Sequence, residues 1–144
     1  MNERKKESVA EVLASRVIGI VVFLIVLGIL NVLADAYVQI PIFLQVVEFL
    51  NANLGLLILI SVIFLVGDLF GALPLPLNLP GPIFGAFGAV LLVIFIARFF
   101  LLFAEITGVG FFFIFEKALS LSVYLLVFII ALIAGYIGLF TGRA

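Results

Sequence analysis

Residues 17–38 read VIGIVVFLIVLGILNVLADAYV, an apolar run whose strongly polar members are Asn31 and Asp35. A hydrocarbon core about 30 Å thick requires about 20 mainly apolar residues in a spanning helix. Lipid offers no partner to backbone N–H and C=O groups, so a spanning segment must satisfy them internally, as a helix does. The run does not alternate between polar and apolar residues, which excludes a β-barrel strand. It predicts a membrane-spanning helix.

Three further segments of similar length and composition follow along the chain. They cover residues 42–66, 83–104 and 118–140. Pro41 and Pro82 stand at the starts of the first two, where a missing backbone N–H costs a helix little. The sequence therefore predicts an all-α, polytopic membrane protein with a four-helix transmembrane domain over residues 17–144. Residues 1–16, MNERKKESVAEVLASR, form a preceding basic and amphipathic segment that we expect in the cytoplasm.

The composition indicates that lipid is the main solvent of this chain. Of its 144 residues, 67% are hydrophobic and 10% are charged, and the mean hydropathy is +1.56. A soluble domain carries about 25% charged residues, and a chain this short has too little interior to bury so many apolar side chains. These values exclude a soluble enzyme, a disulfide-rich secreted scaffold and a disordered chain. The net charge of −1 provides no basic field, so we expect no nucleic-acid partner.

The residue types that usually carry catalysis are missing. The chain has no Cys and no His, which removes thiolate nucleophiles, imidazole bases and the usual zinc ligands. The HExxH, GxSxG and P-loop patterns are absent. Gly67-Asp68 resembles part of the GxGD motif of intramembrane aspartyl proteases, but Leu65 replaces its first glycine. We therefore expect no enzymatic activity, no metal site and no cofactor.

Residues 67–82, GDLFGALPLPLNLPGP, connect the second and third predicted helices and hold four of the five prolines. This proline density excludes a regular helix, yet the stretch is too apolar for an ordinary solvated loop. We expect it to lie in the interface or to re-enter the protein, where non-helical backbone is shielded from lipid. The candidate gate or re-entrant residues are Pro74, Pro76, Asn78 and Pro80. The Phe-rich connection 105–117 is also expected at the interface.

Basic residues are distributed unevenly between the two predicted sides of the membrane. Residues 1–16 contain four of them and the C-terminal tail contains Arg143, whereas the opposite side carries Lys117 beside acidic residues. The positive-inside rule places the more basic side in the cytoplasm. We therefore expect both termini in the cytoplasm and a multi-pass protein of a prokaryotic inner (cytoplasmic) membrane.

One spacing recurs between the two halves of the chain. Glu48 precedes Gly67 by 19 residues, and Glu116 precedes Gly135 by the same 19. The pattern is consistent with two copies of one helical hairpin. It is equally consistent with chance, because any four-helix membrane protein gives similar spacings.

Charged and amide side chains recur at one depth of the predicted helices. Arg98 lies six residues before the end of the third helix, and Glu48 lies six residues after the start of the second. These helices are antiparallel, so both side chains are expected at the same depth. Asn31 of the first helix stands at that level, and Asn51 shares the face of Glu48. The counting predicts a polar cluster of Asn31, Glu48, Asn51 and Arg98 in the outer part of a helical bundle.

Two interpretations of this cluster stay open. A charge at the centre of a spanning helix costs about 2.5–3.5 kcal/mol, so Arg98 needs a partner or water. In the structural interpretation, Glu48 and Arg98 form an ion pair that fixes helix packing. In the functional interpretation, the cluster lines a hydrated path or cavity, and its carboxylate binds cations or protons.

Two stretches resemble known families. Residues 42–71, IFLQVVEFLNANLGLLILISVIFLVGDLFG, resemble the transmembrane-helix repeat of small-conductance mechanosensitive-channel-like proteins. That resemblance implies a helical channel subunit, although those channels also have a soluble β-rich vestibule domain with no counterpart in this sequence. Residues 70–95, FGALPLPLNLPGPIFGAFGAVLLVIF, resemble a signature of the BofA family. Members of that family regulate an intramembrane protease, which implies a membrane-protein partner.

Polar faces on all four predicted helices, together with the channel resemblance, favour a membrane protein that forms or supports an oligomeric channel or transport path for small ions. The alternative is a non-transporting accessory or regulatory subunit of a larger membrane complex. Such a subunit needs lipid-avoiding faces for packing but no hydrated lumen. In both cases the expected partners are the lipid bilayer and either further copies of this chain or another membrane protein.

Overall fold

The computed structural model describes residues 9–141, and this part of the chain is helical apart from short connections. In chain order the elements are α1 (Val9–Ala36), α2 (Pro41–Ala52), α3 (Leu54–Gly71), α4 (Gly81–Thr107), the 3-10 helix η1 (Gly110–Ala118) and α5 (Leu121–Thr141). No β-strand occurs among the described residues.

Four of these helices, α1, α3, α4 and α5, are long and apolar enough to cross a membrane. The shortest, α3, has 18 residues, which corresponds to about 27 Å at 1.5 Å per residue and is close to the thickness of a hydrocarbon core. At most 17% of the apolar window of any of the four is buried inside the chain, so most of their surface is available to lipid. The predicted all-α architecture with four candidate spans is confirmed.

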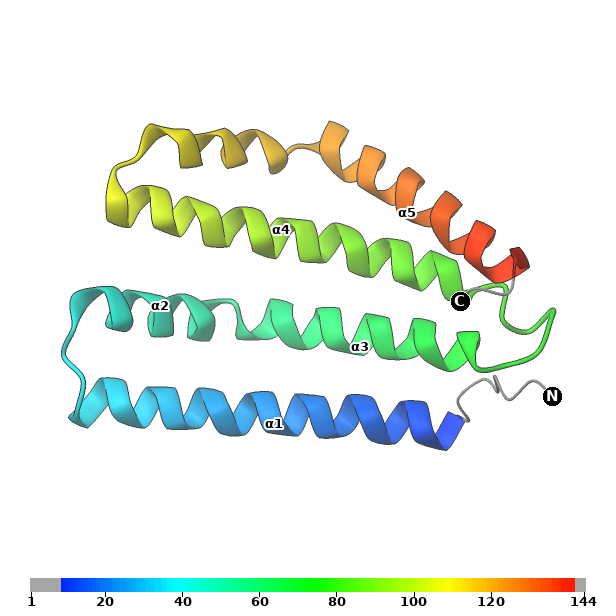
Figure 1. Cartoon of the computed structure of the whole chain (residues 1–144), viewed down its shortest axis with the longest axis horizontal. Helices are drawn as coiled ribbons and strands as arrows, with labels where there is room; N and C mark the ends of the chain where they lie inside the picture. The colour runs from blue at the N-terminus through cyan, green and yellow to red at the C-terminus, as the bar shows by residue number, and fades with distance from the viewer. Residues whose placement is uncertain (1–8, 142–144) are drawn as a thin grey trace.

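The helices lie side by side in a single layer and do not close into the bundle that we expected (Figure 1). α1 forms one edge, α2 and α3 run in line beside it, α4 comes next, and η1 and α5 form the other edge. α4 packs most extensively, against α3 on one side and against α5 and η1 on the other. The start of α1, the end of α5 and the connection between α3 and α4 lie at one end of the layer. We call the opposite end, where α2 and η1 lie, the polar end.

The predicted helix over residues 42–66 is broken at Asn53, which separates α2 from α3. The backbone of Asn53 leaves the helical region, with φ −103° and ψ 12°. Its backbone N–H and its side-chain Nδ2 both donate to the carbonyl oxygen of Phe49, at 3.0 and 2.9 Å. Asn53 thus ends α2, and both its backbone and its side chain bond the last turn of that helix.

Other bounds also differ from the predicted ones. α1 begins at Val9, so residues 9–16 belong to the first long helix, whereas residues 1–8 of the predicted N-terminal segment lie outside the described residues. α4 is longer at both ends than the predicted 83–104, and α5 begins three residues after the predicted start. Within the connection 105–117, η1 stacks Phe115 on Phe100 of α4, with ring centroids 4.6 Å apart.

Glycines set the spacing between α4 and its neighbours. Gly88 of α4 faces Phe64 of α3, and a Cβ at Gly88 would lie 2.6 Å from the nearest ring carbon. Gly135 of α5 faces Pro82 of α4, and a Cβ at Gly135 would lie 2.9 Å from the proline Cβ. Small residues of this kind let helix backbones approach closely in membranes. The contacts of α4 with α3 and with α5 therefore both depend on a glycine, which has no side chain.

Gly135→Ala is expected to lower the thermal stability of the protein, because the new methyl group meets a proline ring that is fixed to its own backbone. Overpacking of this kind costs about 1–3 kcal/mol, which exceeds the roughly 1 kcal/mol that alanine adds in helix propensity. The measurement is the midpoint of thermal unfolding in detergent micelles, followed by circular dichroism.

Gly138→Ala provides the matched control on the same helix, because a Cβ at Gly138 meets no atom within 4 Å. Its midpoint should equal or slightly exceed that of the unmodified protein. Equal midpoints for the two variants would contradict a tight contact between Gly135 and Pro82.

Candidate functional site

Arg98 is held by an asparagine and not by the predicted glutamate. Its Nη1 donates to Oδ1 of Asn53 at 2.9 Å, and Asn53 is only 8% exposed. Glu48 forms no ion pair within residues 9–141. The predicted Glu48–Arg98 pair is therefore wrong. The reason is register: Asn53 stands opposite Arg98, and Glu48 precedes Asn53 by five residues, about 7.5 Å of helix.

The structure brings together two other members of the predicted cluster, Asn31 of α1 and Asn51 of α2. Nδ2 of Asn51 donates to Oδ1 of Asn31 at 2.7 Å, and Nδ2 of Asn31 donates to Oδ1 of Asn51 at 3.1 Å. Each amide also donates to the backbone carbonyl four residues earlier in its own helix. The two amides thus satisfy each other at the boundary between neighbouring helices, as buried or lipid-facing polar groups require.

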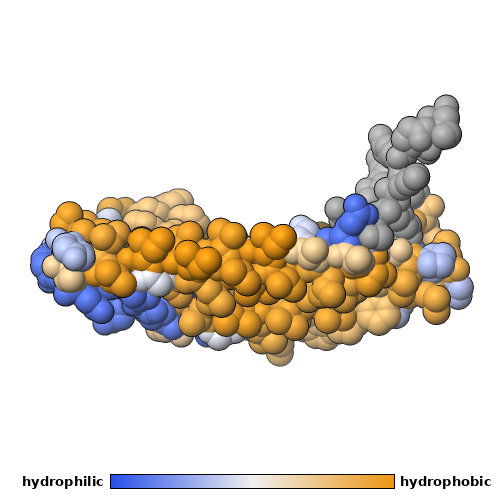
Figure 2. Space-filling view, turned by 90° about the horizontal axis from the view of Figure 1, so that it is seen from below, coloured by the Kyte–Doolittle hydropathy of each residue, from blue (hydrophilic) through white to orange (hydrophobic). Residues whose placement is uncertain are grey.

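Glu48 lies in a groove at the polar end, between α2 and α4. The groove has a volume of about 350 Å³ and also contains Glu105 and Gln45; its remaining lining is Phe49, Ala52, Leu102 and Ile106. Both carboxylates are exposed, and neither forms an ion pair within residues 9–141. Figure 2, which views the layer from its α1 edge, shows hydrophilic residues gathered toward one face at this end. We call this surface the Glu48–Glu105 groove.

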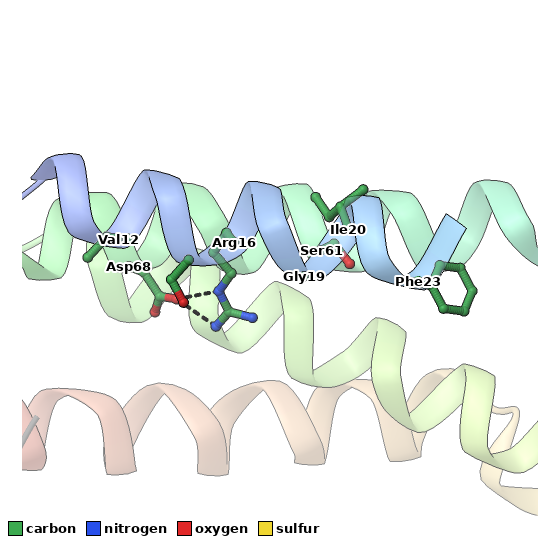
Figure 3. Close-up of a pocket in the computed structure, with 8 residues that line it drawn as sticks. Val12, Arg16, Gly19, Ile20, Phe23, Ser61 and Asp68 are labelled. Atoms are coloured by element: carbon green, nitrogen blue, oxygen red, sulfur yellow. Dashed lines mark hydrogen bonds and ion pairs between the residues drawn. The ribbon is translucent and has the colours of Figure 1, made fainter. Parts of the chain in front are cut away.

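An ion pair that the sequence analysis missed joins α1 to α3 near the other end of the layer (Figure 3). Nη2 and Nε of Arg16 lie 2.6 and 2.8 Å from Oδ2 of Asp68. The side chains are 42% and 44% exposed, and the guanidinium also lies over the ring of Phe64, 5.9 Å from its centroid. The pair borders a cavity of about 280 Å³ that extends along the seam between the helices past Gly19 and Ser61.

The positions of Arg16 and Asp68 in the sequence indicate that they can pair. Arg16 directly precedes the first apolar run and Asp68 follows the second after Gly67, so the two residues bound a pair of antiparallel spans at one end. The signal was obscured because Arg16 ends the hydrophilic N-terminal segment and Asp68 belongs to the protease-like Gly-Asp pair. Treating charges at the ends of neighbouring apolar runs as potential partners would have identified the contact.

The proline-rich connection lies at the end of the layer and does not run back between the helices (Figure 1). Its backbone forms successive tight turns, in which Leu77 N–H donates to Pro74 O at 2.9 Å and Gly81 N–H donates to Asn78 O at 3.1 Å. The hydroxyl of Tyr136 in α5 donates to Leu79 O at 2.8 Å and attaches the turn to the layer.

Of the candidate gate residues, Pro74 and Pro76 are exposed, Pro80 is half-buried and Asn78 is 2% exposed. Oδ1 of Asn78 has no hydrogen-bond donor among the described residues. The structure thus shows a surface turn with one buried amide. A gating role for this segment stays a prediction.

The chemistry available to these sites is limited to amides, carboxylates, guanidinium groups and hydroxyls. Residues 9–141 contain no group of three or more acidic side chains that could hold a metal ion. Comparison with protein-family models, curated proteins and solved structures finds no match to this chain. The features of the chain that bear on its function are therefore the polar end and the Arg16–Asp68 pair.

The Arg16–Asp68 pair should show measurable coupling in a double-mutant cycle. Arg16→Gln and Asp68→Asn are each expected to lower the unfolding free energy, and the double variant should lose less than the sum of the two. We expect a coupling of about 0.5–1 kcal/mol, as for partly exposed ion pairs. The measurement is reversible unfolding in mixed micelles.

The control cycle combines Arg16→Gln with Asp35→Asn. Asp35 lies at the other end of α1, 19 residues away, and is exposed. This cycle should show additive effects. Coupling of the same size in both cycles would mean that the measured term reflects overall charge and not the contact with Asp68.

Proposed function

We propose that this chain is a multi-pass membrane subunit that forms or supports an oligomeric channel or transport path for small ions. The observation that carries the proposal is the exposure of Arg98, Glu48 and Glu105 on a layer one helix thick. Ionisable residues in or near spanning segments are costly and mark ion or substrate pathways by default. A single layer encloses no lumen, so a path requires further subunits to cover the face that carries these charges.

The polar groups stand at two levels of the layer. Asn31 and Asn51 mark one level and Arg16 and Asp68 the other, and the 15 residues between Arg16 and Asn31 correspond to about 22 Å of helix. That separation is compatible with one polar level near each boundary of a hydrocarbon core. Ions crossing between copies would meet fixed amides and charges at both mouths.

The orientation of the chain, the membrane that holds it and its internal repeat are proposed from the sequence. We propose that both termini face the cytoplasm, that the membrane is a prokaryotic inner membrane, and that the two halves are copies of one hairpin. In each half a long helix is followed by a short helix and then by a second candidate span, which supports the last point. The resemblance of residues 42–71 to mechanosensitive-channel-like repeats supports the channel assignment in the same way.

A second candidate function is a non-transporting accessory or regulatory subunit. The observation that favours it is the apolar stretch of α1 between the two polar levels, where residues 17–30 contain no charged or amide side chain. A helix of this kind packs well against a partner but offers little to a hydrated ion. The BofA-like segment 70–95 agrees with a regulatory role beside another membrane protein.

Flux through liposomes that contain the purified chain distinguishes the two functions. The channel function predicts passage of K⁺, Na⁺ or H⁺. It also predicts that Arg98→Leu changes the conductance or the ion preference, because the variant removes an exposed cation that has no ionic partner among the described residues. Absence of flux for all three ions, together with co-purification of a fixed membrane partner, would establish the accessory function instead.

Lys117→Leu serves as the matched control, since it also replaces an exposed basic residue of the polar end. Its flux should equal that of the unmodified chain. Flux that is unchanged in Arg98→Leu as well would count against any role of Arg98 in the path.

A further inference from the structure

The seam between α1 and α3 is packed closely at two points of α1 and is open between them. Val12 and Leu27 are the buried residues of α1, 5% and 4% exposed, and none of residues 13–26 is buried. The two points are 15 residues apart, about 22 Å of helix. The cavity of about 280 Å³ lies along this open stretch.

One face of each helix lines the cavity. On α1, Arg16, Gly19 and Phe23 follow the i, i+3, i+7 spacing. On α3, Ser61 and Asp68 are seven residues apart and share a face. Figure 3 shows Arg16 and Asp68 toward one end of the cavity and Phe23 toward the other. The cavity therefore runs from a charged end along an apolar part of α1.

The charged end lies where two candidate spans leave their apolar stretches. Arg16 directly precedes residues 17–30, which contain no charged or amide side chain, and Asp68 lies in the last turn of α3. At this level a bilayer changes from hydrocarbon to phospholipid headgroups. A molecule in the cavity meets charges at one end and apolar side chains at the other, which is the polarity of a phospholipid.

The ion pair leaves one hydrogen-bonding atom of each residue outside the contact. Nε and Nη2 of Arg16 both approach Oδ2 of Asp68, at 2.8 and 2.6 Å, so Nη1 and Oδ1 take no part in it. In Figure 3 the remaining guanidinium nitrogen points away from Asp68, in the direction of Phe23. The side chains are 42% and 44% exposed, so a ligand can reach the pair. The cavity thus offers a cationic donor and an anionic acceptor side by side.

We propose that this seam binds one phospholipid with a primary ammonium headgroup, of the phosphatidylethanolamine type. A phosphate oxygen accepts from Nη1 of Arg16, and the ammonium group donates to Oδ1 of Asp68. One acyl chain follows the seam past Gly19 toward Phe23.

Charge complementarity selects this headgroup. The headgroup carries one negative and one positive charge, and so does the charged end of the cavity, so the bound state has no net charge. Phosphatidylcholine has a quaternary ammonium without an N–H donor for Asp68. Phosphatidylglycerol has no ammonium group and places its negative charge beside the carboxylate, which is unfavourable.

Gly19 gives the acyl chain its room. It lines the cavity, and a Cβ built on it meets no atom within 4 Å. A larger side chain at this position therefore occupies space in the seam without displacing a neighbour at Cβ. This property allows the lipid site to be blocked while the ion pair stays intact.

Native mass spectrometry of the full chain in mixed micelles tests the headgroup. With equimolar phosphatidylethanolamine, phosphatidylcholine and phosphatidylglycerol of the same acyl chains, the protein should retain the first about tenfold more than either of the others, as expected for one charge-assisted hydrogen bond. Equal retention of all three would overturn the proposal, because it indicates unselective boundary lipid.

Asp68→Asn should reverse the preference. The variant leaves the charge of Arg16 without its carboxylate, so phosphatidylglycerol should be retained above phosphatidylethanolamine. A variant that loses all lipids equally, or keeps the original order of preference, would contradict recognition of the ammonium group by Asp68.

Gly19→Leu tests the path of the acyl chain. It should lower retention of phosphatidylethanolamine by about tenfold and leave the far-ultraviolet circular dichroism unchanged. Gly28→Leu is the matched control: a Cβ at Gly28 also meets no atom within 4 Å, and nine residues place it about 180° around α1 from Gly19. Its retention should equal that of the unmodified chain. Equal retention by both variants would overturn a lipid in this seam.

A soluble headgroup distinguishes a lipid site from a site for a free phosphate compound. O-phosphoethanolamine has the same charged groups but no acyl chain, so at equal concentration it should not displace the lipid. Displacement would show that the seam takes no part in binding and would overturn the proposal. Lipid retention is measured without ion flux, so its result is independent of whether the chain conducts.

Discussion

The register of the helices depends on one constraint: a layer one helix thick has little interior, so a polar side chain between two helices is satisfied by a partner in the neighbouring helix at its own depth. The two asparagines between α1 and α2 meet this requirement by exchanging hydrogen bonds, and Arg16 meets it through Asp68. Arg98 meets it in part, through the neutral amide of Asn53. These lateral contacts fix the register of the helices, because apolar surfaces in lipid provide little preference for one register over another.

The helical class and the number of candidate spans could be predicted from the sequence because the relevant signal is local. A segment of about 20 apolar residues is recognised as a candidate span from its composition alone. The second candidate, Leu54–Gly71, overlaps the predicted 42–66 only in part, and the two short helices α2 and η1 were not predicted. The break at Asn53 was missed because the hydropathy of residues 42–66 predicts one continuous helix and does not register a local change of the backbone at one residue. The single layer was missed for a related reason, since the amphipathic faces of the helices do not specify whether they close around a common axis.

The level of each polar side chain relative to the neighbouring helices was harder to predict than the positions of the helices along the sequence. Counting from assumed helix ends placed Glu48 opposite Arg98, and an error of five residues in register was enough to replace an ion pair by an amide contact. The counting placed Asn31 level with Glu48, whereas the structure pairs it with Asn51, three residues further along α2. The error is small here because the short turn between α1 and α2 leaves little freedom in the alignment of these helices. Where a long connection separates two helices, as between α3 and α4, the relative shift depends on how the connection folds.

The interruption at Asn53 divides one apolar segment into a part of spanning length and a part held at the polar end. α3 has 18 residues, a length suited to a hydrocarbon core, whereas α2 is a separate helix of 12 residues. α2 is held on both sides, by the amide pair of Asn51 with Asn31 of α1 and by the ring of Phe49 against Phe95 of α4. The spanning length of α3 is therefore set independently of the contacts that hold the polar end.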